Sequence, residues 1–278
     1  FYDPWECLPY VTSPESEANC SNVLATDALA QFAIVFSTLI HDVDHVGVPN
    51  SQLAKEKPNV AEKYLHRSLA EQTSVDLTWD LLEEEAYEEL RESIFPTQHE
   101  YNRFRSMVVN IVMSTDIADA SLRDFREQKW QKVYGGSMSQ ESIHEADVED
   151  RKRRQANIMM DLIMMASDIS HTMQTFDVYC EWNERLFREM HMAYQEGRSE
   201  CDPSKGWSLG ELIFFDKHII PLARRLKESG LFGSVASVLL ENAQRNRQCW
   251  QEHGQSIVTN MLMRLGEPFE EDCDAQED

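Results

Sequence analysis

The sequence is poor in the residues that interrupt helices. Its 278 residues include ten glycines and nine prolines. Because glycine and proline are the strongest local signals for turns, so few of them favour long helices joined by few loops. The strict alternation of apolar and polar residues that is typical of strands is hard to find anywhere. We therefore predict an all-α fold, a compact multi-helix domain without internal repeats.

Secretory and membrane signals are also absent. No apolar run approaches the roughly eighteen residues that a membrane-spanning helix needs. Residues 1–6 resemble no signal peptide, and because no methionine opens the chain we expect a piece of a longer protein. The six cysteines are scattered without a Cys-x-x-Cys pair, which predicts reduced thiols. We expect a cytoplasmic chain, or the cytosolic part of a membrane-anchored protein.

Basic residues are few. The chain has 26 Lys and Arg against 49 Asp and Glu, a net charge of −23. Such a field repels nucleic-acid backbones and anionic membrane surfaces, so we expect neither as a partner. An anionic substrate would need a local cation, which a metal ion can supply.

Apolar residues recur at helical spacing in four places. Thr26 is a plausible N-cap for a helix that runs to Ile40 and should be buried nearly all round. The other predicted helices are Asn157–Ser167, Leu212–Leu226 and Phe232–Leu240, with long loops at Tyr134–Arg154 and Gly197–Gly210. We expect an irregular start at 1–25, one domain at 26–265 and a disordered acidic tail at 266–278.

Two of these apolar helices end in ionisable clusters. One ends at His41 and Asp42, and the other at Asp168 and His171. Such groups are costly at the end of a buried helix unless something compensates their charge. If the two ends meet, His41, Asp42 and Asp168 form a mixed nitrogen and oxygen metal site, with Asp42 able to bridge two ions. Alternatively, each Asp caps the next helix and each His lies in a satisfied polar pocket.

These motifs resemble the class I cyclic nucleotide phosphodiesterase catalytic domain, a branch of the HD-type metal phosphohydrolases. The likeness runs from about Asp27 to Gln255, and its central signature is HDVDHVGVPNSQL at 41–53. Four further matches follow in the family's order: Ser68–Glu71, Ser114–Asp116, Ala166–Ser170 and Glu211–Asp216. The resemblance implies that residues 26–265 are a phosphodiesterase catalytic domain.

The resemblance also implies a pair of metal ions. His41, Asp42 and Asp168 would ligate Zn²⁺, and Asp42 would bridge to a second ion, Mg²⁺ or Mn²⁺. His45, Glu71 and Thr115 would hold the waters of that second ion. Asp42 and His45 are accordingly the catalytic candidates.

A nucleotide pocket is implied as well. Phe214 would stack on the purine, Glu211 and His171 would contact the substrate, and the wall would be formed by Trp182, Leu186 and Ile117. Phe214 and Trp182 also lie on apolar helical faces, where core packing is the commoner explanation. The implied reaction is hydrolysis of a 3′,5′-cyclic nucleotide to its 5′-monophosphate by a hydroxide that bridges the two metals, with a general acid protonating the leaving oxygen.

Two features depart from the family pattern. The family carries a His-Asn-x-x-His motif that supplies a zinc ligand and the general acid, but no histidine precedes His41 here. Either this chain is truncated, or it is a silent domain that binds cyclic nucleotide without hydrolysing it.

The second departure is Glu211, which stands where the family typically has glutamine. An ionised carboxylate only accepts hydrogen bonds and so matches the adjacent donors of guanine, which predicts a lean toward cGMP over cAMP. If Glu211 is held protonated, that preference vanishes.

A third hypothesis is an HD-type enzyme for another phosphate ester. Fusion to regulatory or cyclase domains in a longer protein is also compatible with the sequence.

Overall fold

The described part of the chain is helical throughout. The computed structural model describes residues 24–135 and 145–265, and neither range contains a strand, which confirms the all-α prediction. The α-helices are α2 (Ala28–Ile40), α3 (Asn50–Glu56), α4 (Pro58–Lys63), α5 (Leu69–Leu82), α6 (Glu88–Ile94), α7 (Gln98–Met113), α8 (Ala120–Tyr134), α9 (Glu145–Asp168), α10 (Phe176–Gln195), α11 (Trp207–Phe214), α12 (Ile220–Ser229) and α13 (Val235–Met263). Shorter helical turns are η1 (Glu85–Tyr87), η2 (Ser170–Met173), η3 (Pro203–Lys205) and η4 (Phe215–Ile219).

Polar side chains fix where several helices begin. The Asp27 carboxylate accepts the backbone N–H of Ala30 at 3.1 Å and caps α2. At the start of α7, Thr97 and Glu100 form a reciprocal capping box. Each cap satisfies backbone donors that the first helical turn leaves free, and replacing a capping side chain by alanine typically costs about 1 kcal/mol.

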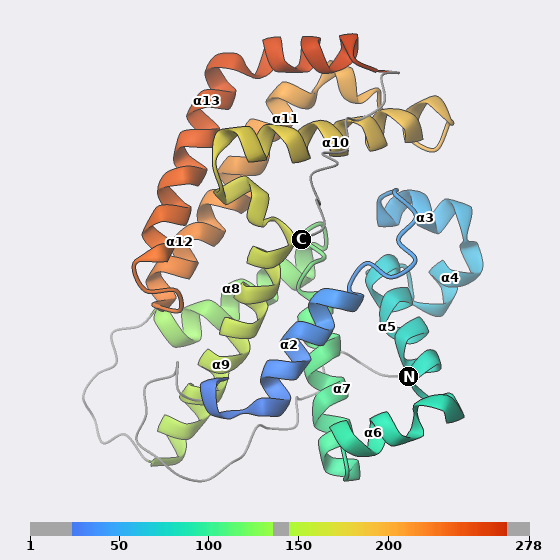
Figure 1. The fold of residues 1–278 in the computed structure, drawn as a ribbon, viewed down its shortest axis with the longest axis vertical. Coiled ribbons are helices and arrows are strands. Elements are labelled where there is room, and N and C mark those ends of the chain that lie inside the picture. Colours follow the sequence, from blue (N-terminus) through green and yellow to red (C-terminus); the bar gives the residue numbers. More distant parts are fainter. Residues whose placement is uncertain (1–23, 136–144, 266–278) are drawn as a thin grey trace, which may run out of the picture.

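Helix α9 lies between two apolar cores (Figure 1). One of its faces joins the core built from α2, α5 and α7, whose centre is the fully buried Phe104. The opposite face joins the core of α10 to α13, which contains Tyr179, Phe215 and Trp250. Because α9 contributes to both cores, its end at Asp168 is held at their junction.

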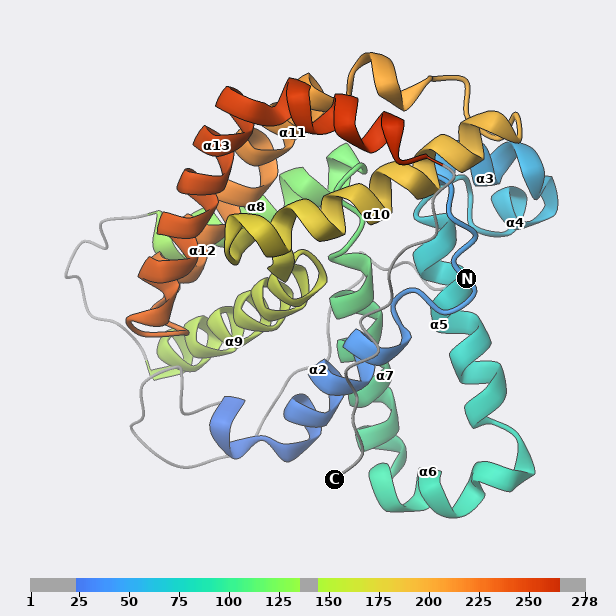
Figure 2. The same ribbon diagram turned by 45° about the horizontal axis from the view of Figure 1, so that its top comes forward.

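A third, smaller cluster positions the loop that follows α2. Val48, Leu53, Ala61 and Leu69 pack together with Ala193 near the end of α10. Figure 2 shows α3 and α4 beside that end of α10. Residues 41–49 therefore run between α2 and a firmly packed α3, which limits where their side chains can lie.

The structure corrects several sequence predictions. Helix α2 is not buried all round, because Val35 and Leu39 are 65% and 78% exposed, and its cap is Asp27 rather than Thr26.

Element boundaries differ too. Helix α9 begins at residue 145 inside the predicted loop to residue 154, α11 begins at residue 207 inside the second predicted loop, and α13 continues to residue 263. The expectations for residues 1–23 and for the tail at 266–278 lie outside the described residues. Among the described helices, none combines the length and the apolar character that crossing a membrane requires.

A candidate metal and nucleotide site

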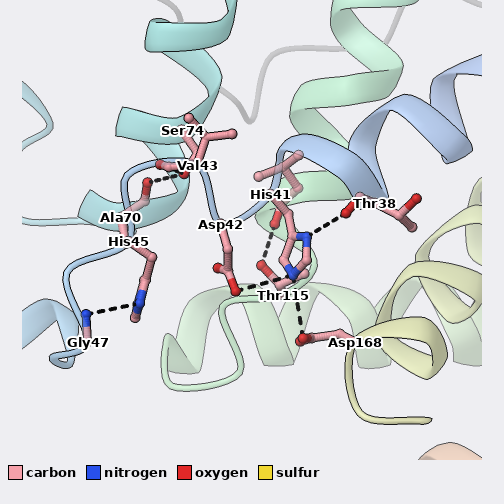
Figure 3. A network of polar contacts seen from close by, with 11 residues as sticks. Thr38, His41, Asp42, Val43, His45, Gly47, Ala70, Ser74, Thr115 and Asp168 are labelled. Atoms are coloured by element: carbon pink, nitrogen blue, oxygen red, sulfur yellow. Dashed lines mark hydrogen bonds and ion pairs between the residues drawn. The ribbon is translucent and has the colours of Figure 1, made fainter. Parts of the chain in front are cut away.

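Three of the predicted ligands come together where α2 and α9 end. His41 follows the last residue of α2, and Asp168 is the last residue of α9. The Nε2 atom of His41 lies 3.4 Å from Oδ2 of Asp42 and 3.5 Å from Oδ1 of Asp168 (Figure 3). On the other side of the ring, Nδ1 lies 2.9 Å from the carbonyl oxygen of Thr38. Because a carbonyl only accepts, Nδ1 carries a hydrogen and Nε2 is the atom that faces the carboxylates.

The carboxylates control the protonation of this imidazole. The hydrogen bond with Asp168 raises the pKa of His41 to about 9. Burial opposes this increase, and the charge of Asp42 and the bond to the Thr38 carbonyl add smaller increases. At neutral pH the ring is therefore a cation between two anions. A metal ion at the same place would replace the proton on Nε2.

The donor set fits a zinc-type ion in its chemistry, and the two distances from Nε2 of His41 are compatible with ligands that share one ion. Two atoms that each lie 2.0–2.1 Å from a tetrahedral zinc are about 3.3 Å apart, close to the two Nε2–oxygen distances. The bond from Nδ1 to Thr38 is also the outer support that orients a ligating histidine. As the side chains stand, however, no group of three or more His, Cys, Asp or Glu within 24–135 and 145–265 is arranged to hold an ion.

His45 lies apart from these three side chains. It is exposed, and its Nδ1 accepts the backbone N–H of Gly47 at 3.3 Å. The turn that carries it contains left-handed backbone at Asp44 (φ 60°) and Gly47 (φ 70°). The Ser74 hydroxyl of α5 donates to the Val43 carbonyl at 2.8 Å and fixes the near end of this turn (Figure 3).

Glu71 belongs to a buried polar network that the sequence analysis did not identify. Asn50 donates from Nδ2 to Oε2 of Glu71 at 3.0 Å and to Oδ2 of Asp116 at 3.5 Å. The same Asp116 oxygen accepts the hydroxyl of Ser68 at 2.7 Å. Burial raises the pKa of Glu71, while the bond from Asn50 lowers it. A buried carboxylate such as that of Asp116 requires hydrogen-bond donors. A search for such donors could have identified Asn50 and Ser68.

Thr115 lies next to Asp116, two residues after the end of α7. Its hydroxyl donates to the Val112 carbonyl at 2.8 Å, at the end of α7. The hydroxyl hydrogen is thus committed, while the oxygen lone pairs stay available as acceptors.

The predicted pocket residues lie on α10, on α11, in η2 and, for Ile117, in the loop between α7 and α8. Trp182, Leu186 and Ile117 are 48%, 46% and 36% exposed, so none of the three is a core residue. The rings of His171 and Trp182 have centroids 6.0 Å apart. Phe214 is half-buried against the core of α10 to α13.

Glu211 ends a chain of hydrogen bonds whose direction is fixed. The indole N–H of Trp207 donates to Oδ1 of Asn183 at 3.0 Å. Asn183 then donates from Nδ2 to the hydroxyl oxygen of Tyr179 at 3.3 Å, and Tyr179 donates to Oε2 of Glu211 at 2.6 Å. Burial raises the pKa of Glu211, whereas the bonds from Tyr179 and Asn183 lower it. Because the indole can only donate, the chain delivers a hydrogen to the carboxylate.

Comparison with known proteins identifies the family of this chain. A model of the 3′,5′-cyclic nucleotide phosphodiesterase family matches residues 10–209, more than half of the chain. The chain belongs to this family. The resemblance stated from the sequence is therefore confirmed.

Individual relatives are more distant. The mouse dual specificity calcium/calmodulin-dependent 3′,5′-cyclic nucleotide phosphodiesterase 1C is 25% identical over 171 residues, which are 62% of this chain and 21% of the relative. The human 1B enzyme is 25% identical over 170 residues, 61% of this chain and 27% of the relative. The chain thus spans about a fifth to a quarter of these relatives.

The fold also has a counterpart among solved structures. The phosphodiesterase domain of the RhoPDE fusion protein from the choanoflagellate Salpingoeca rosetta has a TM-score of 0.63 at 18% identity, with 88% of this chain and 76% of that chain covered. This likeness concerns the fold. Within this fold, the ends of α2 and α9 bring His41, Asp42 and Asp168 together. Four of the nucleotide candidates, Trp182, Leu186, Glu211 and Phe214, lie on α10 and α11.

Proposed function

We propose that this chain forms the metal-binding and base-binding parts of a phosphodiesterase that hydrolyses 3′,5′-cyclic nucleotides to 5′-monophosphates. The observation that carries the proposal is the convergence of His41, Asp42 and Asp168, from two helices far apart in the sequence, at 3.4 and 3.5 Å. Two carboxylates and an imidazole at a junction of two cores suit a divalent ion better than a structural ion pair. The substrate, the cytoplasmic setting and any further domains are part of this proposal.

Different residues of the chain would hold the two ions. His41, Asp42 and Asp168 would hold Zn²⁺, and Asp42 with the waters near His45, Glu71 and Thr115 would hold Mg²⁺ or Mn²⁺. Bound ions supply an activated water and neutralise charge on the phosphoryl oxygens. The Thr38 carbonyl keeps Nε2 of His41 directed at the site.

Glu211 supports a preference for cGMP. Its Oε2 already accepts the Tyr179 hydroxyl, and Oε1 of an ionised carboxylate offers acceptor capacity to a base. The N1–H and N2–H₂ groups of guanine are two adjacent donors, whereas adenine presents one donor beside an acceptor. Burial raises the pKa of Glu211 and the Tyr179 bond lowers it, so we expect acceptance from guanine at a pH above that pKa.

A second function has a specific observation in its favour. No histidine precedes His41 in the sequence, so the family's general acid has no counterpart among those positions. A domain that binds cyclic nucleotide without hydrolysing it would be consistent with this.

One experiment separates these possibilities. The full chain, supplied with Zn²⁺ and Mg²⁺, is assayed for 5′-GMP and 5′-AMP release and for cyclic-nucleotide binding by calorimetry. We expect metal-dependent turnover that Asp168→Asn abolishes and that Asp124→Asn, an exposed aspartate on α8, leaves unchanged. Binding without turnover would establish the silent domain. If the chain shows no binding and no turnover, the proposal is refuted. Release of phosphate from other esters would favour a different phosphohydrolase.

A further inference from the structure

One ridge of helix α13 contacts two of the segments that carry nucleotide candidates, η2 with the residue after it and α11. Residues spaced four apart share one side of a helix, and on α13 such a row consists of Asn242, Asn246, Trp250 and Gly254. Asn246, Trp250 and Gly254 are buried. The family match ends at residue 209, so it assigns no role to this helix.

The two asparagines hold three consecutive carbonyl groups. Nδ2 of Asn246, which is fully buried, donates to the carbonyls of Thr172 and Gln174 at 3.0 Å each. Nδ2 of Asn242, one turn earlier, donates to the carbonyl of Met173 at 3.2 Å. These carbonyls belong to η2 and to the residue after it, where regular helix bonding is interrupted between α9 and α10. The segment that contains His171 is therefore attached to α13 by side-chain amides.

The next two turns of the ridge hold the other segment. The indole N–H of Trp250 donates to the carbonyl of Ser208 at 3.0 Å, in the first turn of α11. A Cβ atom at residue 254 would lie 2.8 Å from the Trp250 ring and 3.0 Å from the Ser208 hydroxyl, so glycine allows this close packing. The Trp250 ring also packs edge-on against Tyr179 with centroids 5.5 Å apart. Tyr179 is the donor to Glu211.

We propose that Asn242, Asn246 and Trp250 are positioning residues that set the distance between the His171 segment and Glu211, and thereby the width of the nucleotide pocket. This inference rests on the proposed function for its ligand. The three side chains act through His171 and Tyr179, and none of them belongs to the proposed site. All three side chains donate N–H groups to backbone carbonyls. Removing one of these donors would leave its carbonyl acceptor without that hydrogen bond, which is costly where the group is buried.

Aspartate is the sharpest replacement for Asn246. It has nearly the same shape but no N–H, and its oxygens would face the carbonyls of Thr172 and Gln174. The segment must move away from α13 or the carboxyl must take up a proton. Asn260→Asp is the matched control, because Asn260 lies on the same helix and is exposed. Asn242→Ala, which removes one bond at a half-buried position, is the milder second variant.

Two measurements on the full chain test the proposal. The first is the NMR signal of the His171 ring, assigned by its loss in His171→Asn; the Trp182 ring 6.0 Å away makes this signal sensitive to the position of the segment. The second is the Kd for 3′,5′-cGMP in the presence of Zn²⁺ and Mg²⁺. We expect Asn246→Asp to shift the His171 signal and weaken cGMP binding about tenfold, and Asn242→Ala to weaken it about threefold. Asn260→Asp should do neither.

The outcomes are separable. If folded Asn246→Asp and Asn242→Ala leave the His171 signal and the Kd unchanged, the ridge has no positioning role. If Asn246→Asp does not fold, Asn242→Ala decides. If a substitution also moves the NMR signals of His66, which follows α4, and His99 in α7, it loosens the whole fold and contradicts the proposal. If the unmodified chain binds no cyclic nucleotide, the proposed function fails, while the His171 signal alone still tests the ridge.

Discussion

At the scale of single residues, the nucleotide pocket depends on the direction of one hydrogen-bond chain. Trp207 can only donate, so Asn183 and Tyr179 must each pass a donor onward until Glu211 accepts. The sequence left open whether Glu211 is held protonated, and two opposing effects act on this carboxyl: burial raises its pKa and the Tyr179 bond lowers it. A change of pH alters the charge of Glu211, so it can test whether this charge sets the base preference.

The expected pH dependence has a definite sign. Burial raises the pKa of Glu211, so the carboxyl takes up a proton at a higher pH than an exposed glutamate does. Above that pKa it accepts from guanine, and as the pH falls through it the preference for cGMP over cAMP should decline by about tenfold. The measurement is the ratio of the two Kd values across pH. Glu211→Gln should give a ratio that does not vary with pH, and Glu252→Gln, which is exposed on α13, should behave like the unmodified chain.

Asn50 is the second residue whose replacement is informative. One amide links the N-terminus of α3 to Glu71, to Asp116 and, through Oδ1, to the N–H of Ala70 at 2.9 Å. Asn50→Asp would place a third carboxylate beside two others and remove both donated bonds. We expect the free energy of unfolding to fall by about 1–3 kcal/mol. Denaturant unfolding measures this, with the exposed Asn59→Asp as control; equal losses in the two variants would contradict the assignment.

At the scale of elements, the sequence predicts which segments are helical better than where they end. Apolar periodicity identified α2 and the second half of α9. The first half of α9 is a charged helix in which Arg154 pairs with Asp150 four residues away, and such a solvent-facing stretch has no apolar period to detect. The polar ridge of α13 was missed for a related reason, since its asparagines bond to backbone carbonyls that no sequence pattern reveals.

Helix α2 shows why apolar residues alone overestimate burial. Leu39 and Ile40 are neighbours of the same size, yet Leu39 is 78% exposed and Ile40 is 5% exposed. We expect Ile40→Ala to lower the free energy of unfolding by about 2–5 kcal/mol and Leu39→Ala to change it by less than about 0.5 kcal/mol. Chemical denaturation of the two variants measures the difference. Similar losses would mean that the outer face of α2 is covered in the full chain.

At the scale of the whole molecule, the candidate metal site lies where two cores meet. Helix α2 belongs to one core, and α9 belongs to both. The chain also carries a net charge of −23, which disfavours the compact state through self-repulsion. A cation bound between His41 and Asp168 would therefore act on stability twice, by linking the two helix ends and by reducing the local negative charge.

Zinc binding should consequently be visible as thermal stabilisation of the metal-stripped full chain. A ligand at a hundredfold excess over its Kd contributes about 2.7 kcal/mol, and each kcal/mol is worth about 2–4 °C in Tm for a chain of this size. His41→Ala should remove the effect, and His99→Ala, an exposed histidine outside the site, should keep it. Because the pKa of His41 is about 9 without metal, zinc must displace a proton, so the stabilisation should increase as the pH rises toward that value. A rise in Tm that is equal in both variants, or that declines with increasing pH, would place the ion elsewhere.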